Sequence, residues 1–298
     1  MDISGKNIVV IGGAGFIGSH VVEELLSTDV GRITIYDNFA RGKRANIAAS
    51  LEDERVSLFP DGGDVREIDV LNKALKGADG VIDLAAMWLL HCKDYPRTAF
   101  DVNIAGTFNV LEACVNNDVE RLVWSSSGSV YGDAVSVPMT EEHPFNNRNF
   151  YGATKIAGEA MARAFHDRYG LDYVGLRYMN VYGPHQDQTA AYTGVIPIML
   201  NKIDANEAPV INCDGSQAYD FVTARDTARC NVLALQSDVT DEFYNVGTGV
   251  QTSIRELCDL ILQLRGSDLK VEYRPYSEED SRRMVQNRIG STDKAQRD

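Results

Sequence analysis

The sequence predicts an α/β fold: a doubly wound parallel sheet with a smaller α/β lobe at its C-terminal side. Over the first 180 residues short apolar runs alternate with helical patterns, which is typical of parallel strands covered by helices on both faces. A glycine-rich turn joins the first run directly to the first helical pattern. Beyond about Asn180 prolines punctuate shorter elements. This change indicates a separate lobe over the carboxyl ends of the strands, where ligands bind in such folds.

The expected elements follow from residue type and spacing. Runs rich in β-branched residues predict strands at Lys6–Ile11, Arg32–Tyr36, Arg55–Phe59, Gly80–Leu84, Arg121–Ser125 and Asp172–Arg177. Apolar residues at helical spacing predict helices at Phe16–Leu26, Ile68–Lys76, Arg97–Asn117, Phe150–Tyr169, Asp226–Gln236 and Ser253–Leu264. We expect residues 1–178 to form the first domain, with part of 224–246 returning to it. Residues 179–298 are expected to form mainly the second lobe.

Composition excludes several classes of partner. The 298 residues carry 29 Lys and Arg against 43 Asp and Glu, a net charge of -14, which disfavours nucleic acid and anionic membranes as partners. No apolar stretch is long enough to cross a bilayer. The five cysteines are scattered without a CxxC pair, so we expect reduced thiols and no metal site. The N-terminus runs straight into a strand, and we expect a cytoplasmic protein.

The clearest local signal is the segment Gly12-Gly13-Ala14-Gly15-Phe16-Ile17-Gly18, between the first strand and the first helix. Gly12 allows the tight turn, Gly15 lets a pyrophosphate approach the backbone, and Gly18 lets the helix pack on the strand. The free N–H groups and positive dipole end of the helix favour phosphate. The pattern therefore predicts a dinucleotide site, with a glycine turn that holds no ligand as the alternative.

Asp37 ends the second expected strand, where a carboxylate accepts hydrogen bonds from the adenosine ribose hydroxyls. Because a carboxylate repels a 2′-phosphate, NAD is favoured over NADP. Three nearby cations weaken that preference: Arg41, Lys43 and Arg44. The pair Asp64-Val65 follows the third strand and is expected to hold the adenine or to belong to a plain turn.

A phenol and an ammonium, those of Tyr151 and Lys155, lie four residues apart on one face of an expected helix. A tyrosine with its ordinary pKa of about 10 is a poor base at neutral pH. The lysine cation and the positive nicotinamide ring both favour the phenolate. The serines at 125–127 end the fifth strand, where a hydroxyl relays the proton of a substrate alcohol or merely caps the strand. With the glycine loop and Asp37, these residues predict oxidoreductase-type chemistry.

Nearly the whole chain, from Asn7 to about Ala295, resembles an extended short-chain dehydrogenase/reductase of the NAD-dependent epimerase/dehydratase family. More narrowly, it resembles the nucleotide-sugar epimerases of the UDP-glucose 4-epimerase type. The motifs that carry the resemblance are GGAGFIGSH at 12–20, YDN at 36–38, GDV at 63–65, LAA at 84–86, DVNIAGTFNVLEA at 101–113, SSSGSVYG at 125–132, YGATK at 151–155 and RYMNVYGP at 177–184.

The resemblance implies a role for each matched residue. Tyr151 is the base, Lys155 binds the nicotinamide ribose, and Ser127 contacts the sugar 4-hydroxyl. Asn180 resembles the ligand of the nucleotide diphosphate. A Rossmann-type domain is implied to bind NAD through Gly12, Gly15, Phe16, Ile17, Gly18, Asp37, Asn38, Asp64, Val65, Leu84, Ala85, Ala86, Asn103, Tyr151 and Lys155.

The residues after Ser127 separate the reactions of the family. Related dehydratases carry an Asp-Glu pair there for elimination, and uronate decarboxylases tend to carry a Glu two positions on. This sequence has Gly128 and Ser129, so elimination lacks its acid and base. Exchange of hydrogen at C4 needs only Ser127, Tyr151 and NAD, which favours epimerisation.

The sequence also departs from the family's pattern. Relatives usually carry an Arg for the diphosphate where Tyr219 stands. Candidates to replace its charge, with solvated surface arginines as the alternative, are Arg282, Arg283 and Arg288. Arg288 also falls near the position that limits sugar size in related epimerases, where an Arg suits a carboxylate-bearing sugar such as a uronic acid. Asp83 stands where relatives often have His, and Trp88 lies near the expected nicotinamide site.

We expect an NAD-dependent nucleotide-sugar 4-epimerase that acts on a UDP-hexose or UDP-hexuronic acid. The alternatives are a related dehydratase, decarboxylase or reductase, including dTDP-sugar or NADP variants, and a non-catalytic NAD-binding protein. The intact Ser127, Tyr151 and Lys155 argue against the last. Apolar and small residues recur at helical spacing within Phe150–Tyr169. We therefore expect a homodimer built from this helix and Arg97–Asn117.

Overall fold

A seven-stranded, fully parallel sheet forms the centre of the computed structural model, which describes residues 1–187, 194–276 and 285–298. The strand order is β11-β6-β5-β4-β1-β2-β3. The strands are β1 (Asn7–Ile11), β2 (Arg32–Tyr36), β3 (Val56–Leu58), β4 (Gly80–Asp83), β5 (Arg121–Ser127), β6 (Tyr173–Tyr178) and β11 (Glu242–Val246). The predicted doubly wound α/β class is confirmed.

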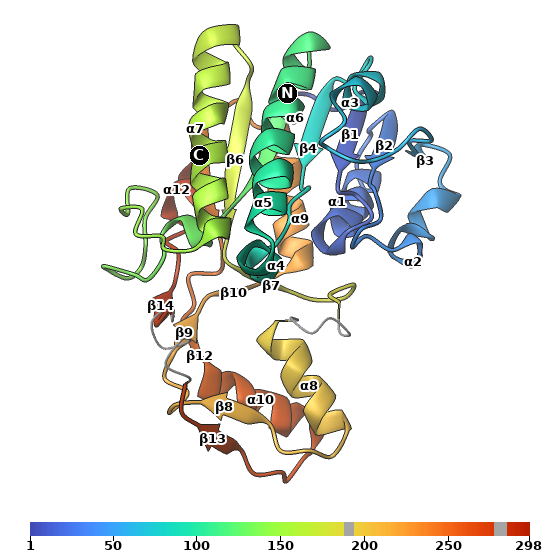
Figure 1. Cartoon of the computed structure of the whole chain (residues 1–298). Helices are drawn as coiled ribbons and strands as arrows, with labels where there is room; N and C mark the ends of the chain where they lie inside the picture. The colour runs from blue at the N-terminus through green and yellow to red at the C-terminus, as the bar shows by residue number, and fades with distance from the viewer. Residues whose placement is uncertain (188–193, 277–284) are drawn as a thin grey trace.

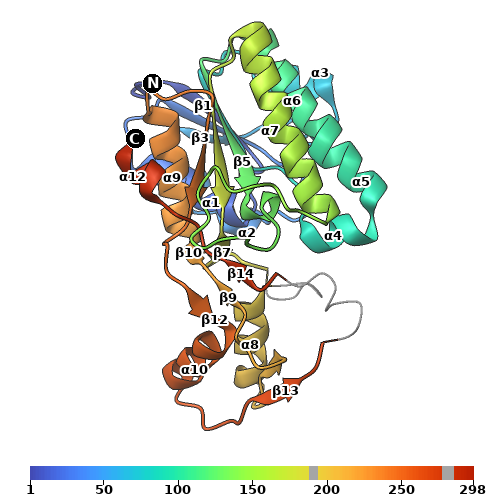
Figure 2. The same cartoon turned by 90° about the vertical axis from the view of Figure 1, so that its left-hand side faces the viewer.

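Helices cover both faces of this sheet, as Figures 1 and 2 show. On one face lie α1 (Phe16–Leu26) and α9 (Ala224–Gln236), and on the other α3 (Ile68–Ala74), α6 (Gly106–Asn116) and α7 (Phe150–Tyr169). Alternation along β1 explains the two cores, because Ile8 and Val10 belong to one cluster and Val9 and Ile11 to the other. Both faces of the central strands are therefore buried, as parallel sheets require.

Most predicted elements form within a few residues of their expected bounds. The single helix expected at Arg97–Asn117 is interrupted: α5 (Pro96–Phe100) passes through the π-helical turn η2 (Asp101–Ala105) into α6. Short elements without a clear sequence signal are α2 (Arg44–Ile47), η1 (Ser50–Glu52), α4 (Leu89–Asp94) and η3 (Gly128–Val130). Helix α7 is capped at both ends. At its start the Asn149 side chain accepts from the Gly152 N–H, and at its end Gly170 adopts the left-handed conformation that terminates a helix.

The smaller lobe lies below the carboxyl ends of the strands in Figure 1. Helices α8 (Val195–Asp204) and α10 (Ile254–Arg265) share an apolar cluster with Ile211 of β8. Its short strand β8 (Val210–Asn212) pairs with β13 (Glu272–Arg274). In a second small sheet, β9 (Ala218–Tyr219) lies between β12 (Thr252–Ser253) and β14 (Asn287–Arg288) and pairs with both. The strands β7 (Asn180–Tyr182) and β10 (Phe221–Thr223) join the lobe to the sheet.

The chain crosses between the two bodies several times. Strand β11 pairs with β6 at the edge of the large sheet, and α12 (Asp293–Arg297) lies against β11. The C-terminal residues are also held there, since the Met139 N–H donates to the Ile289 carbonyl. Within the part of the chain that the structure describes, no helix combines the length and apolar character needed to span a membrane.

Candidate active site

The glycine loop after β1 forms a backbone cradle at the start of α1. Gly12 has φ +76, and a Cβ there would lie 3.1 Å from the Ala85 nitrogen. A Cβ at Gly18 would overlap the Gly12 carbonyl oxygen, so the helix approaches the strand only because this residue is glycine. The first turn of α1 begins at Gly15 without a side-chain cap. Its free N–H groups and positive dipole end fit the pyrophosphate of a dinucleotide.

Asp37, one residue beyond β2, lies directly beside this cradle. Its carboxylate accepts from the Ala14 N–H at 2.9 Å and from the Phe39 N–H at 2.8 Å. Burial raises the pKa of Asp37, although these two hydrogen bonds oppose the shift. The carboxylate also lines the cleft, where it is able to accept from ribose hydroxyls.

Other predicted cofactor contacts lie along the same cleft, which has a volume of about 880 Å³. Lining residues among them are Gly12, Gly15, Phe16, Ile17, Gly18, Asn38, Asp64, Val65, Leu84, Ala85 and Ala86. Asp64 pairs with Arg66 at 2.6 Å, and this hydrogen-bonded partner lowers the pKa of Asp64. Asn103 is not a lining residue. Its buried amide bonds to both backbone groups of Met87 and to the Thr154 hydroxyl, so it supports the chain that follows Leu84–Ala86.

The three predicted catalytic residues meet at the other end of the cleft. Tyr151 and Lys155 lie on α7, and Ser127 is the last residue of β5. Burial raises the pKa of Tyr151 to about 12, while a hydrogen bond with Ser127 and the positive charge of Arg288 lower it. Lys155 is also close to this phenol, because its Nζ lies 5.8 Å from the centre of the Tyr151 ring. The Ser127 hydroxyl also accepts from the Ser129 N–H at 3.1 Å, which orients it.

Lys155 is a buried ammonium with a defined position. Its Nζ donates to the Ser125 carbonyl at 2.6 Å and lies 4.8 Å from the centre of the Trp124 ring. Burial lowers the pKa of Lys155 to about 8, and the negative charge of Asp83 opposes that shift. Burial in turn raises the pKa of Asp83, at the end of β4, to about 6. Sequence reasoning noticed Asp83 only as a departure, because nothing along the chain links it to Lys155.

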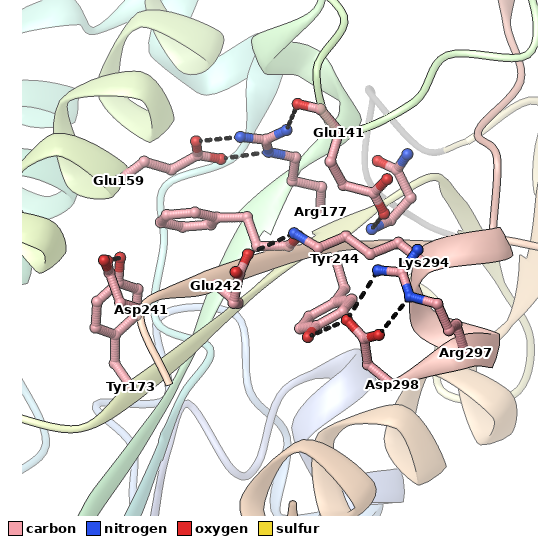
Figure 3. A network of polar contacts seen from close by, with 12 residues as sticks. Glu141, Glu159, Tyr173, Arg177, Asp241, Glu242, Tyr244, Lys294, Arg297 and Asp298 are labelled. Atoms are coloured by element: carbon pink, nitrogen blue, oxygen red, sulfur yellow. Dashed lines mark hydrogen bonds and ion pairs between the residues drawn. The ribbon is translucent and has the colours of Figure 1, made fainter. Parts of the chain in front are cut away.

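A buried polar network lies next to the catalytic residues in sequence, and its central pair, Arg177 with Glu159, is drawn in Figure 3. Arg177 donates twice to Glu159, at 2.8 and 2.7 Å, and also donates to the Tyr131 hydroxyl at 2.8 Å. The Ser126 hydroxyl donates to Glu159 at 2.6 Å, and the Tyr131 hydroxyl donates to Asn245 at 2.7 Å. Four elements are thereby joined under the site: the end of β5, the catalytic helix α7, β6 and β11.

On the lobe side, Asn180 and Arg288 line the cleft. Arg288, on β14, is half-buried beside Gly128, and its buried Nε has no hydrogen-bond partner among the described residues. Tyr219 does not line the main cleft, and its hydroxyl donates to the Val285 carbonyl at 2.8 Å. It borders a smaller cavity of about 300 Å³, which Asn180, Gln217 and Tyr276 also line. Arg282 and Arg283 lie outside the described residues.

Two histidines and a carboxylate lie close together beside α1. His20 and Glu23 belong to this helix, and His185 follows β7. The imidazole rings stack at 4.9 Å with only 9° between their planes. A metal ion lies in the plane of the ring that ligates it, and stacked parallel rings do not share such a point. His20 already contacts Glu23 at 3.1 Å and the Pro184 carbonyl at 3.0 Å. The cluster ties α1 to the chain after β7.

Comparison with known proteins supports this description. The NAD dependent epimerase/dehydratase family matches residues 8–247. A protein of Methanocaldococcus jannaschii, provisionally named a UDP-glucose 4-epimerase, is 38% identical over 257 residues, covering 85% of this chain and 81% of the relative.

Two solved structures are similar over almost the whole chain. A UDP-N-acetylglucosamine 4-epimerase from Methanobrevibacter ruminantium M1, in complex with UDP-N-acetylmuramic acid, is 34% identical with a TM-score of 0.91 and covers 98% of this chain and 91% of that one. A dTDP-glucose 4,6-dehydratase from Streptomyces venezuelae, with NAD bound, is 28% identical with a TM-score of 0.89 and covers 98% and 90%. These matches confirm the resemblance found in the sequence motifs.

Proposed function

Because the chain belongs to the NAD-dependent epimerase/dehydratase family, we propose that it inverts C4 of a nucleotide sugar, a UDP-hexose or UDP-hexuronic acid, through a transient 4-keto sugar. One observation carries the proposal: Ser127, Tyr151 and Lys155 meet beside the cofactor cradle without a carboxylate partner. Among the described residues that line the cleft, the carboxylates are Asp37, Asp64 and Asp187, which follow β2, β3 and β7. Elimination and decarboxylation therefore lack an acid or base beside Ser127.

In this proposal the chain's own groups move one proton. Bound NAD would supply hydride chemistry: it would accept a hydride from C4 of the sugar and return it to the opposite face of the sugar ring. Tyr151, as phenolate, takes the proton of the sugar 4-hydroxyl directly or through the Ser127 hydroxyl. The same path returns the proton after the 4-keto sugar has turned over. Lys155 would hold the nicotinamide ribose. Its positive charge would favour the phenolate form of Tyr151.

Inversion requires the sugar to turn while the rest of the substrate stays fixed. The anchor must therefore lie on the nucleotide diphosphate and not on the ring. Asn180 lies on β7 where the lobe meets the sheet, and it borders both the main cleft and the smaller cavity beyond it. This position suits a group that holds the diphosphate between sugar and base.

Arg288 supports the uronic acid branch of the proposal. Its side chain is half-buried beside Gly128, and its buried Nε has no partner among the described residues. Arg288 and Tyr151 line the same cleft, so both side chains are able to face the same sugar. A partly desolvated, incompletely bonded guanidinium binds a carboxylate more strongly than a neutral hydroxyl.

A panel of UDP-, dTDP- and GDP-sugars tests the function, with products identified by NMR. We expect a C4 epimer of a UDP-sugar to form without added reductant, since the cofactor is recycled and stays bound. Turnover that needs stoichiometric NADPH would contradict the proposal. A 4-keto-6-deoxy product would identify a dehydratase, and loss of CO₂ from a uronic acid would identify a decarboxylase.

A homodimer through α6 and α7 belongs to the same proposal. Ala160 and Ala164 are exposed on the outer face of α7, and Phe108 of α6 is 44% exposed. Small exposed residues let a second helix pack closely. Introducing glutamates at positions 160 and 164 is expected to give a monomer in sedimentation velocity, because two charges would be buried in the interface. Leu264→Glu, on the exposed end of α10, is the control and should leave the dimer intact.

A further inference from the structure

A cation–π contact crosses the cofactor cleft. The Arg41 guanidinium lies 4.5 Å from the centre of the Trp88 ring. Arg41 belongs to the loop after β2, and Trp88 follows β4. Both side chains line the cleft, although 46 residues of sequence separate them.

The position of this contact follows from the sheet. Strands β2 and β4 pair with β1 on its two sides, and β1 leads into the glycine loop. A contact between the loops after β2 and β4 therefore spans the cleft opposite the Gly12–Gly18 cradle. The pyrophosphate of a dinucleotide is the part that lies between its adenosine and nicotinamide ends. It is thus the part that this contact would cover.

The loop that carries Arg41 is held against the cradle. The Lys43 N–H and the Asn46 side chain both donate to the Ala14 carbonyl, each at 3.0 Å. The Lys43 ammonium pairs with Asp187 at 3.4 Å across the mouth of the cleft. Arg41 is therefore presented from a fixed loop and not from a free one.

Arg41 and Trp88 both have hydrogen-bond donors that a ligand could use. Trp88 Nε1 is buried and has no hydrogen-bond partner among the residues that the structure describes. The Arg41 guanidinium stacks on a ring face, an arrangement that leaves its N–H groups at the edge available to phosphate oxygens. The cradle itself offers backbone N–H groups but no side-chain cation in the first turn of α1, whose first four residues are Phe16, Ile17, Gly18 and Ser19.

We propose that Arg41 and Trp88 form a clasp over the cofactor pyrophosphate and so slow the release of NAD. The guanidinium offsets one of the two negative charges of the pyrophosphate, while the indole covers the phosphates from solvent and donates through Nε1. A cofactor that is recycled in every turnover needs no exit, so such a clasp costs the reaction nothing. A competing assignment for Arg41 is the 2′-phosphate of NADP, and one for Trp88 is the nicotinamide ring.

The test measures cofactor binding on protein stripped of nucleotide, without any sugar substrate. Affinity is measured by calorimetry and release by stopped-flow, for NAD, NADP and ADP-ribose. Arg41→Ala and Trp88→Leu should each weaken NAD and ADP-ribose by about tenfold, the effect of losing one charge-assisted hydrogen bond. Most of the change is expected in the release rate. The double variant should lose less than the product of the single losses, because each side chain positions the other.

Two variants keep the test specific. Arg44→Ala is the matched control, because Arg44 begins α2 three residues after Arg41 and stacks on Phe39 at 5.2 Å outside the cleft lining. It should bind NAD and ADP-ribose normally. Arg41→Lys keeps the charge without the planar stack and should fall between wild type and Arg41→Ala. Thermal unfolding of each stripped variant establishes that it is folded.

Three results would overturn the clasp. A loss confined to NADP in Arg41→Ala would assign Arg41 to the 2′-phosphate. A loss for NAD with unchanged ADP-ribose in Trp88→Leu would assign Trp88 to the nicotinamide. Unchanged release of all three ligands from both folded variants would leave the contact without a role in cofactor retention.

Discussion

The floor of the cleft and its rim satisfy their polar atoms in opposite ways. On the floor, the buried Arg177 donates two hydrogen bonds to the buried Glu159. Glu159 also accepts from the Ser126 hydroxyl, and Arg177 also donates to the Tyr131 hydroxyl. On the rim, three buried side-chain atoms lack partners within the described ranges 1–187, 194–276 and 285–298: Trp88 Nε1, Gln217 Oε1 and Arg288 Nε. All three border one of the two cavities.

This difference separates two tasks. A buried polar group without a partner costs free energy, so a protein tolerates it chiefly where a ligand completes it. The hydrogen bonds of the floor are complete without a ligand, and Glu159 ties the catalytic helix α7 to β5 and β6. In the function proposed here, the ligand completes the hydrogen bonds of the rim. Substitutions on the floor should therefore act on catalysis or folding, and substitutions on the rim should act on binding.

The largest effect is expected from Tyr151→Phe, which removes the proton acceptor and leaves the floor beneath it intact. Loss of a positioned acid–base group typically lowers a rate by about 10²–10⁴-fold. We expect turnover to fall by at least the lower factor, while NAD remains bound at the wild-type ratio. Epimerisation followed by NMR and the ultraviolet spectrum of the purified protein check the two parts. Near-normal turnover on the true substrate would contradict the proposed proton path.

A substitution that removes a hydrogen-bonding partner on the floor should instead lower the free energy of unfolding. Arg177→Ala leaves the Glu159 carboxylate buried with only Ser126 as a hydrogen-bond partner, and breaking such a pair costs about 3–5 kcal/mol. Urea unfolding followed by circular dichroism measures the loss. Arg225→Ala, at an exposed position on α9, is the control. A loss in Arg177→Ala no larger than in the control would show that the floor is not a unit.

The rim should respond in the reverse manner. Arg288→Met removes a half-buried guanidinium whose buried Nε has no partner among the described residues, so the free energy of unfolding should change by less than about 1 kcal/mol. Binding of a UDP-hexuronic acid should weaken about tenfold, and that of the matching UDP-hexose much less. Calorimetry with the two sugars compares them. Equal losses for both would remove the carboxylate from the proposal.

The smallest expected change is in the pH profile. Activity should decline as pH rises through about 8, because burial lowers the pKa of Lys155 and the neutral amine no longer favours the phenolate. Asp83 raises that pKa, so Asp83→Asn should move the alkaline limb to lower pH. The limb should stay in place in Asp167→Asn, which alters an exposed carboxylate of the same helix. An unmoved limb in Asp83→Asn would separate Asp83 from Lys155.

The fold and the cofactor cradle could be predicted because their signals are local. The first strand, the glycine turn and the first helix are continuous in sequence, and Tyr151 and Lys155 share one helix face. Six of the seven strands of the large sheet could be recognised from their own apolar and β-branched residues. Strand β11 was expected only as part of the segment 224–246 that returns to the first domain, and not as a strand. The π-helical turn at Asp101–Ala105 was not predictable, since its residues have the same apolar spacing as their neighbours.

The rest of the site depends on contacts between distant residues. Arg41 meets Trp88, and Asp83 acts on Lys155, through the order of the strands and not through spacing along the chain. The smaller cavity brings Gln217 together with Tyr276 across two short strands of the lobe. Gln217 lies two residues before Tyr219, which the sequence analysis singles out, but nothing in the sequence marks Tyr276 as its partner.

The position of β11 at the edge of the sheet has a consequence for synthesis on the ribosome. Strand β6 ends at Tyr178, and its outer edge pairs only with β11, which ends at Val246. A growing chain therefore carries an unpaired strand edge until about four fifths of it has been made. Such an edge pairs readily with edges of other chains. Chains released before Glu242 are expected to aggregate. In chains that reach Val246, β11 can pair with β6 and cover this edge, and these chains are expected to stay soluble.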